Sequence, residues 1–404
     1  MIDQLLSKEI QSFIEDHQGD DPNDLRLKYK TIFDVPAALV IDQISARKKA
    51  KDKLPTWYNH RRIIYPPSLN LEQSSSERTA LQKTKLLKEM MGVAAGQSRV
   101  LDLTGGLGID GFFFSQVCKA LHFIEPNYDL IKIAEHNHHE LSITNINYHN
   151  STAEDFLNLL PDTMTFDAIY IDPSRRSMGQ KVFSLSQCVP DVIKLQDKIW
   201  QFTDNLIIKT SPLLDIKLGL RELQHVKMVN VISVDNECKE VLFCCEKNFL
   251  SEPTVVAINL ADKDSSFSFS FSEEERSQVS YSDPLLYLYE PNASLLKSGA
   301  FKTIAARFHI HKLHPNTHLY TSDHVITNFP GKVFQIESTV KSDDKELMNY
   351  FENSKANILT RNYPLSVAAL RKKTRLKEGG KKFLIGCSGV RKKFLVVATK
   401  LNSL

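Results

Sequence analysis

The chain has 404 residues, 42% of them hydrophobic and 25% charged, which is the composition of a globular protein with more than one domain. It holds no apolar run of 18 residues and no charged-then-apolar leader, so the sequence predicts neither a transmembrane helix nor a signal peptide, and we expect a cytoplasmic monomer. The net charge of +3 hides an asymmetry: the 50 residues from Lys355 carry 13 Lys and Arg and one acid, a net +12, so the first 354 residues carry −9.

Residues 1–90 are expected to form a helical amino-terminal domain, because apolar residues recur at helical spacing in LLSKEIQSFIEDH and AALVIDQISARKKAKDKL. The following stretch TWYNHRRIIY mixes Trp57 and Tyr65 with Arg61 and Arg62. Rings interleaved with arginines can stack on bases and pair with phosphates, so Arg61 and Arg62 are candidate RNA-binding residues. The alternative is a connector that packs its rings on the next domain.

The stretch RVLDLTGGLGID, residues 99–110, follows a helix whose start is predicted by the capping box Ser74-x-x-Glu77. Its first residues predict a buried strand, its glycines a tight turn, and residues 111–118 a helix. Glycines suit a backbone that turns sharply and comes close to a cofactor, whose polar end can meet the exposed N–H groups. Glu125 ends the next strand, where a carboxylate can accept hydrogen bonds from both hydroxyls of a ribose. This unit alone fits NAD as well as other nucleoside cofactors.

Residues 91–249 alternate apolar strands with helical stretches, which predicts an α/β fold with a doubly wound parallel sheet. A later strand, AIYI, ends in Asp172-Pro173, at the edge where ligand-facing strands of such a sheet stop. The remaining strands are expected near 99–103, 121–125, 146–149 and 205–209, and then at VKMVNVISV and EVLFCCEK.

Metal binding is not predicted. His136, His138 and His139 lie in AEHNHHEL without an acid or cysteine completing a site at ligand spacing, so a solvated helix face is the interpretation. Six cysteines without CxxC spacing predict buried thiols in a reducing compartment.

These motifs resemble those of the class I S-adenosylmethionine (SAM) methyltransferases, whose first strand carries acidic-x-x-x-Gly-x-Gly and whose fourth ends in Asp/Asn-Pro-Pro-aromatic. The resemblance is closest to nucleic-acid methyltransferases, including the trimethylguanosine synthase type, and the last two strands resemble the antiparallel close of that class. It implies a Rossmann-like sheet with SAM as cofactor. The cofactor-binding residues that it implies are Asp102, Thr104, Gly105, Gly106, Gly108, Asp110, Glu125, Thr152 and Ala153.

The sequence departs from the family pattern at several positions. Thr104 replaces a glycine that many members carry, and Thr152 stands where an Asp usually meets the adenine amine. Ser174 and Arg175 replace the second Pro and the aromatic, so the usual ring over a target base is missing from the motif.

The candidate catalytic residues are Asp172, Pro173, Ser174 and Arg175. Asp172 would accept a hydrogen bond from an exocyclic amine, with the Pro173 carbonyl as a second acceptor, which aims the amine's lone pair at the methyl group. Arg175 or Arg176 would hold phosphate or base. The alternative is that Asp-Pro only ends a strand and that the arginines are solvated.

Asp-Pro-x-Arg also resembles the RNA uracil-C5 methyltransferases, which need a cysteine nucleophile after the next strand. Thr210 stands where that cysteine would be. A threonine hydroxyl has no accessible anionic form near neutral pH, unlike a thiol, so direct methylation of a nitrogen is favoured.

Beyond residue 250 the sequence predicts two small α+β domains. Residues 250–330 alternate FSFSFS and then read as strand, turn and helix, which indicates a ferredoxin-like domain. Residues 331–404 give a strand, a basic helix, a Gly-Gly turn and two further strands, and resemble the THUMP-like, RNA-binding module of a bacterial group of class I methyltransferases. Its cations predict a polyanion partner, and the candidate RNA-binding residues are Arg371, Lys372, Lys373 and Arg375.

The sequence therefore predicts a SAM-dependent methyltransferase that acts on a base nitrogen in tRNA or rRNA, without a metal and away from membranes. Two alternatives stay open. One is an NAD(P)-dependent oxidoreductase, and the other is a catalytically silent RNA-binding protein that has kept the SAM pocket. The sequence names neither the RNA, nor the base, nor the atom.

Overall fold

The computed structural model describes residues 2–66, 71, 74–175, 184–261, 264–341 and 347–401. The chain divides into two compact units, one made of Met1–Met228 and Glu240–Ser251, the other of Val229–Lys239 and Glu252–Leu404. Within the described ranges, no helix is both long enough and apolar enough to cross a membrane.

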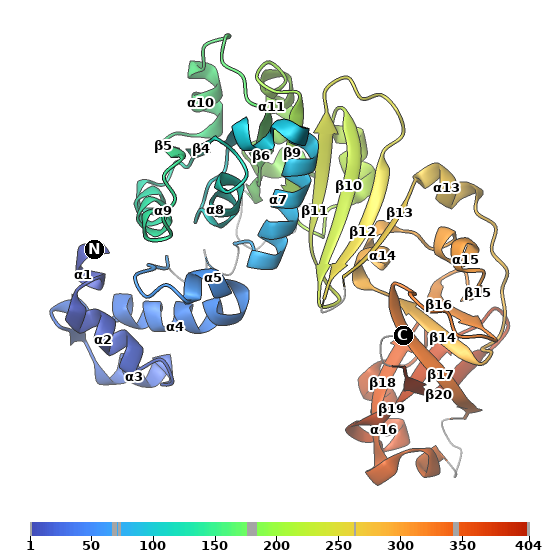
Figure 1. Ribbon diagram of the computed structural model, residues 1–404. Helices are drawn as coiled ribbons and strands as arrows, with labels where there is room; N and C mark the ends of the chain where they lie inside the picture. Colours follow the sequence, from blue (N-terminus) through green and yellow to red (C-terminus); the bar gives the residue numbers. More distant parts are fainter. Residues whose placement is uncertain are drawn as a thin grey trace. The chain divides into compact units, whose positions relative to one another are not determined.

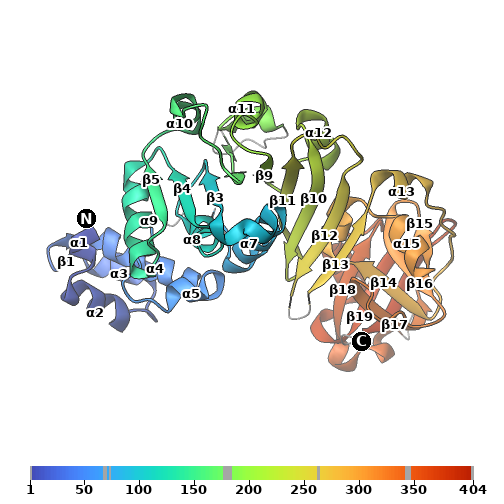
Figure 2. The same cartoon turned by 45° about the horizontal axis from the view of Figure 1, so that its top comes forward.

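The first unit begins with short helices, as the sequence predicts, and with a two-stranded ribbon that it does not predict. Ser7 and Asp21 each accept a backbone N–H and cap α2 and α3. The elements are α1 (Ile2–Leu5), α2 (Lys8–Asp16), α3 (Pro22–Lys28), β1 (Thr31–Ile32), β2 (Val35–Pro36), α4 (Ala37–Lys53) and α5 (Pro55–Tyr58). Their apolar side chains form one core with those of α8 (Ile109–Ser115), so Val40 and Ile44 belong to the same cluster as Phe112 and Phe113. Figures 1 and 2 show these blue helices beside α8 and α9 (Tyr128–Glu140).

The helix before the glycine stretch is α7 (Glu77–Met91), and its cap differs from the prediction. Ser76, not Ser74, is the N-cap: its hydroxyl accepts from the Thr79 N–H at 3.2 Å, and the Thr79 hydroxyl accepts from the Ser76 N–H at 3.1 Å. The Ser74 hydroxyl instead donates to the Leu71 carbonyl at 2.7 Å. The Ser74-x-x-Glu77 assignment was therefore wrong by two residues. A short 3-10 helix, η1 (Gly92–Gln97), leads on to the first strand of the sheet.

The sheet of the first unit has the strand order β11-β9-β6-β3-β4-β5. Strands β5, β4, β3, β6 and β9 pair in parallel, and β11 pairs antiparallel with β9. Their bounds are β3 (Arg99–Asp102), β4 (Ala120–Ile124), β5 (Ile146–His149), β6 (Ala168–Ile171), β9 (Asn205–Thr210) and β11 (Glu237–Glu246). The expected Rossmann-like sheet is confirmed.

Helices cover both faces of this sheet, which explains why its central strands are mostly apolar. Figure 2 shows α7, α8 and α9 on one face. On the other lie α10 (Ala153–Leu159), α11 (Val192–Ile199) and α12 (Ile216–Glu222). The smaller elements of this unit are β7 (Ser174–Arg175), η2 (Leu185–Gln187) and β8 (Cys188–Val189). Because β3 and β6 are parallel neighbours, the segments that follow Asp102 and Ile171 meet at one edge of the sheet.

The second unit contains two groups of strands. In the first, β12 (Thr254–Leu260) lies between β10 (Val226–Val234) and β13 (Ser265–Phe269). The second is a seven-stranded sheet of order β15-β16-β14-β17-β20-β19-β18. Its strands are β14 (Tyr287–Pro291), β15 (His311–His314), β16 (Thr317–Ser322), β17 (Gly331–Val340), β18 (Lys355–Arg361), β19 (Lys377–Ser388) and β20 (Lys393–Lys400). The helical elements are α13 (Phe271–Arg276), α14 (Ala293–Ser298), α15 (Thr303–Phe308), η3 (Leu347–Tyr350), η4 (Glu352–Ser354) and α16 (Val367–Thr374).

The Gly-Gly pair of the carboxy-terminal region is not a turn between helix and strand. Gly379 and Gly380 lie inside β19, with φ of +106° and +84°. The parallel pairing of β18 with β19 shifts there, between Ala356 and Asn357. Glycine is needed because only a residue without a side chain adopts these angles readily, and the irregularity lets one strand continue through them.

Candidate active site

The glycine turn after β3 is closed from below by aromatic rings. A Cβ on Gly105 would lie 2.3 Å from the Phe123 ring, and one on Gly108 would lie 2.6 Å from the His138 ring. At Gly106 the nearest atom is 3.9 Å away, although its φ of +55° also favours glycine. Gly105 and Gly108 therefore make room for packing beneath the turn, and the turn is open at Gly106.

His138 is buried on α9, so the predicted solvated face is wrong for this residue. One ring nitrogen lies 2.8 Å from the Gly108 carbonyl and the other 2.8 Å from the Tyr148 hydroxyl. Burial lowers the pKa of His138 to about 4, although the Gly108 carbonyl opposes this, so the ring is neutral at pH 7. His138 thus supports the turn. His138 follows the buried Ile131 by seven residues and the buried Ala134 by four, and this helical spacing could have indicated that its side chain faces inward.

The same stretch of α9 holds the connector from the amino-terminal helices. Asn137 accepts from the Ile64 N–H at 2.9 Å and donates to the Ile64 carbonyl at 2.8 Å, and His136 lies 2.8 Å from the Arg62 carbonyl. Trp57 is fully buried and meets Phe112 edge to face at 6.1 Å. The rings of TWYNHRRIIY that the sequence offered for base stacking are thus packed inside the protein at Trp57 and Tyr65, as the connector alternative held.

Glu125 is fixed by two backbone N–H groups. Its Oε2 accepts from Gly106 at 2.9 Å and its Oε1 from Asn127 at 2.8 Å. Asn150 donates to the carbonyls of Glu125 and Pro126, which ties the end of β5 to this loop. Each carboxylate oxygen keeps a second lone pair, so Glu125 can still accept from a ribose diol.

Asp102 offers an acceptor that nothing described in the chain satisfies. Its Oδ1 accepts from the Thr104 N–H at 3.0 Å, whereas its buried Oδ2 has no partner among the described residues. Burial, together with three neighbouring carboxylates, raises the pKa of Asp102 to about 8, against the hydrogen bond from Thr104. A cationic ligand beside the turn would satisfy this oxygen. The orphaned acceptor, the open side at Gly106 and the free lone pairs of Glu125 together fit the expected SAM.

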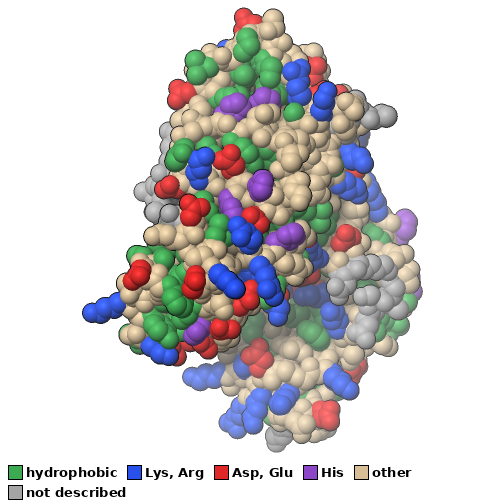
Figure 3. Space-filling model, turned by 60° about the vertical axis from the view of Figure 1, so that its left-hand side comes forward, with side chains coloured by type: hydrophobic (Ala, Val, Ile, Leu, Met, Phe, Trp, Pro, Cys, Tyr) green, Lys and Arg blue, Asp and Glu red, His purple; other side chains and the backbone are tan. Residues whose placement is uncertain are grey.

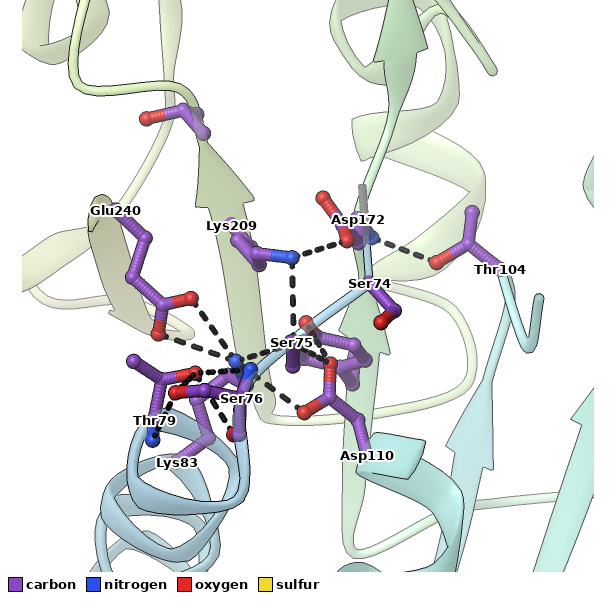
Figure 4. Close-up of polar contacts among 12 residues, drawn as sticks. Ser74, Ser75, Ser76, Thr79, Lys83, Thr104, Asp110, Asp172, Lys209 and Glu240 are labelled. Atoms are coloured by element: carbon purple, nitrogen blue, oxygen red, sulfur yellow. Dashed lines mark hydrogen bonds and ion pairs between the residues drawn. The ribbon is translucent and has the colours of Figure 1, made fainter. Parts of the chain in front are cut away.

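Asp172 stands next to this turn. Its backbone N–H donates to the Thr104 hydroxyl at 2.6 Å, and its side chain is 34% exposed. Thr104, which replaces a family glycine, therefore links the β3 turn to the end of β6. The residues predicted to hold the cofactor and to orient the acceptor meet at the carboxyl edge of β3 and β6, as Figure 4 shows for Asp172 and Thr104.

Behind Asp172 lies a buried network of charges that sequence reasoning missed (Figure 4). Lys209 lies 2.5 Å from Asp172 Oδ2, and Lys83 lies 3.2 Å from Asp110 and 3.0 Å from Glu240. Burial alone would lower the pKa of Lys209, but the three carboxylates raise it above its usual range, so Lys209 stays charged. The available signal was a lysine near the end of the otherwise apolar strand LIIKT.

Asp110 belongs to this network and faces the protein interior. Its Oδ2 accepts from the Ser75 hydroxyl at 2.7 Å and from the Tyr170 hydroxyl at 3.0 Å. Burial opposes ionisation, but Lys83 and Lys209 outweigh it and lower the pKa of Asp110. These contacts give Asp110 a supporting role within the chain, and its direct contact with a cofactor stays a prediction.

Other predicted site residues have partners within the chain. Thr152 caps α10: its hydroxyl accepts from the Asp155 N–H at 3.1 Å and donates to the Asp155 carboxylate at 2.8 Å, and the next residue, Ala153, is buried. The Ser174 hydroxyl donates to the Val189 carbonyl at 3.2 Å. Contacts of Thr152 and Ala153 with a cofactor, and a catalytic part for Pro173 and Ser174, stay predictions. The side chain of Arg175 and all of Arg176 lie outside the described structure.

Arg61 and Arg62 are exposed, and each pairs with an acid. Arg61 lies 3.2 Å from Glu15, and Arg62 lies 3.1 Å from Glu140. Figure 3 shows basic and acidic side chains interspersed, with histidines among them, on the face that it draws. An RNA contact through these two arginines would compete with their present partners, and it stays a prediction.

The cations of the α16 cluster, defined as Arg371, Lys372, Lys373 and Arg375, lie at the carboxyl end of α16. Lys372, Lys373 and Arg375 are exposed, and Arg371 is half-buried. Arg371, Lys372 and Arg375 line a shallow hollow of about 600 Å³ together with Val367 and Glu378. The described part of the chain contains no group of three or more His, Cys, Asp and Glu arranged to hold a metal ion.

Comparison with known proteins gives matches of three kinds. Family models match a ferredoxin-like domain at residues 287–330 and a THUMP domain-like region at residues 331–400. Among solved structures, a presumed methyltransferase from Porphyromonas gingivalis W83 is 32% identical to this chain, with a TM-score of 0.85, and the match covers 97% of this chain and 98% of that one.

A curated relative is the ribosomal RNA small subunit methyltransferase J of Bdellovibrio bacteriovorus. It is 33% identical over 94 residues, which are 22% of this chain. The matched stretch spans 37% of the length of that relative.

Proposed function

This chain belongs to the class I SAM-dependent methyltransferases that carry a carboxy-terminal THUMP-like domain, and we propose that its methyl acceptor is a nitrogen of an RNA base. Membership of this family removes the oxidoreductase alternative. The observation that carries the proposal is the position of Asp172: a partly exposed carboxylate hydrogen-bonded through its own N–H to the turn expected to hold SAM.

The chemistry of the site supports a nitrogen acceptor. SAM, when bound, supplies an electrophilic methyl group on a sulfonium. Asp172 accepts a hydrogen bond from an amine N–H, which aims the nitrogen lone pair at that methyl group in near-attack geometry. Asp102 and Glu125 would hold the ammonium and ribose ends of SAM. The Asp172 carboxylate or water would take the proton that the amine loses as it is methylated.

Covalent catalysis at a base carbon is disfavoured by the residue that follows Lys209. Thr210 is buried, and its hydroxyl donates to the Val241 carbonyl at 3.0 Å. A committed hydroxyl with no accessible anion is a poor nucleophile, so direct transfer to nitrogen is the simpler reaction.

RNA as the substrate class is supported by the tail and by the relatives. The α16 cluster presents exposed cations in the region that matches a THUMP domain-like model, and the curated relative is by name a ribosomal RNA methyltransferase. We further propose four parts with distinct tasks: residues 1–90 support the cofactor turn, 91–249 transfer the methyl group, and 250–330 carry the tail, 331–404, that binds RNA. A cytoplasmic location belongs to the same proposal.

The test is to incubate purified protein and methyl-labelled SAM separately with total RNA, total protein and a metabolite extract. We expect label in RNA, and nucleoside mass spectrometry then names the base and atom. Label in protein alone would refute the RNA proposal. Binding of SAM and RNA without turnover would instead support the catalytically silent RNA-binding alternative.

A further inference from the structure

Lys209 touches the residue proposed to orient the acceptor. It lies on β9, next to β6 in parallel register, with Ile208 paired to Ile171, so its side chain meets Asp172 at the shared carboxyl edge. Its Nζ is 2.5 Å from Asp172 Oδ2 and 3.4 Å from the Ser75 hydroxyl. Only 12% of the Lys209 side chain is exposed. Among the described residues no hydrogen bond is formed to the other oxygen, Oδ1. That oxygen can therefore accept a hydrogen bond from the amine that receives the methyl group.

The two lysines of this network share Ser75 but contact different carboxylates. Lys83 contacts both oxygens of Glu240, at 3.0 and 3.1 Å, and lies 3.2 Å from Asp110, which compensates the carboxylates that are far from solvent. Lys209 makes its shortest contact with the one carboxylate of the network that reaches solvent. Balancing buried charge alone does not require that contact, because a carboxylate that is 34% exposed can be hydrated.

We propose that Lys209 is a positioning residue for methyl transfer: it holds Asp172 Oδ2, so that Oδ1 faces the amine in one fixed orientation. The inference rests on the proposed function of Asp172 as the acceptor of an amine N–H. The Asp172 N–H bonded to Thr104 fixes the backbone, and Lys209 fixes the remaining side-chain rotation. A charge-assisted hydrogen bond from a nearly buried ammonium is short and directional, which suits this task.

The first test is a double-mutant cycle of Lys209→Met and Asp172→Asn, with methyl-labelled SAM and total RNA as substrates. Lys209→Met is expected to lower kcat between 10-fold and 100-fold with the KM for SAM unchanged, and Lys209→Arg to recover part of the loss. In the Asp172→Asn background, Lys209→Met should have no further effect, since its partner is already gone. An equal loss in both backgrounds, or no loss in either, would overturn the inference.

The second test does not depend on the substrate. The side-chain carboxyl ¹³C signal of Asp172, assigned by its loss in Asp172→Asn, is compared at one neutral pH in the wild type and in Lys209→Met. Losing the ammonium contact at Asp172 Oδ2 should move this chemical shift, and an unchanged shift would overturn the pairing. A changed shift in a protein that labels no RNA would refute the proposed function and still support the pairing.

Discussion

The glycine turn and the α16 cluster use polar groups in opposite ways. At the turn, Glu125 and Asp172 are each held by named partners within 3 Å, and the supporting His138 is buried. In the α16 cluster, three of the four cations are exposed. Preorganised groups act through direct hydrogen bonds, so a small displacement weakens them. Exposed cations act through a longer-range electrostatic field, which salt screens. The glycine turn is therefore suited to positioning the reacting groups, and the α16 cluster to adding affinity for a polyanion.

The largest expected effect comes from removing the acceptor carboxylate. Asp172→Ala should lower kcat by about 10² or more, the scale of losing a positioning or transition-state contact, while SAM affinity changes little. Turnover on RNA measures the change in kcat, and calorimetry with SAM measures the cofactor affinity. Equal losses in both would mean that Asp172 supports the cofactor turn instead.

Neutralising the α16 cluster should leave the turn intact and weaken RNA binding. Each lost phosphate contact costs roughly fivefold at about 0.1 M salt and lowers the log–log salt slope by about one unit, so the quadruple Gln variant should bind roughly 600-fold more weakly. Binding isotherms at several salt concentrations measure both quantities. The matched control neutralises Lys85, Lys88, Lys194 and Lys227, four exposed cations of the first unit. An equal loss in the control would show that only net charge matters.

The third prediction is that SAM affinity depends on pH through Asp102, a residue of the glycine turn. The pKa of Asp102 is raised to about 8, so the free protein holds a proton there at pH 7, and a cationic ligand that needs the carboxylate must displace it. SAM affinity should therefore rise with pH, by about fivefold between pH 7 and pH 8, and level off above. Asp102→Asn should abolish the dependence. Calorimetry in buffers of different ionisation enthalpy detects the released proton, and a pH-independent Kd would contradict the prediction.

The smallest effects come from the two helix caps, which allow a matched comparison. Ser76 caps α7 in the first unit, and Ser366 caps α16 in the second. Each Ser→Ala change should cost about 1 kcal/mol of local helix stability. Ser76→Ala should lower turnover, because α7 carries Lys83, and Ser366→Ala should weaken RNA binding. Ser74→Ala, whose hydroxyl caps nothing, serves as the control for Ser76. If Ser76→Ala weakened RNA binding, or Ser366→Ala lowered turnover with RNA binding unchanged, the proposed division of tasks would be contradicted.

Local patterns were sufficient for the sheet and for the order of its motifs. The strands predicted near 146–149 and at VKMVNVISV match β5 and β10. The short apolar run AIYI predicts a strand buried on both faces, and β6 is buried throughout. Three cap candidates stand in a row at residues 74–76, and only the turn geometry decides between Ser74 and Ser76.

The network behind Asp172 could not be read from the sequence, because its members lie far apart in the chain. Ser75, Asp110 and Lys209 meet only once β9 and β6 are paired and α7 is folded against them. His138 was assigned wrongly because its neighbours in sequence are polar. The close approach of Gly108 confirms the inward orientation that helical spacing could have indicated.

The hydrogen bonds between α9 and residues 62–64 limit where the chain can be truncated. A fragment lacking the first 66 residues would strip Asn137 of both its hydrogen bonds and uncover Phe112 and Phe113, directly beneath the cofactor turn. An unpaired buried amide and a bare apolar patch favour aggregation over a smaller working enzyme. Truncations that seek a minimal catalytic core should therefore begin from the other end of the chain.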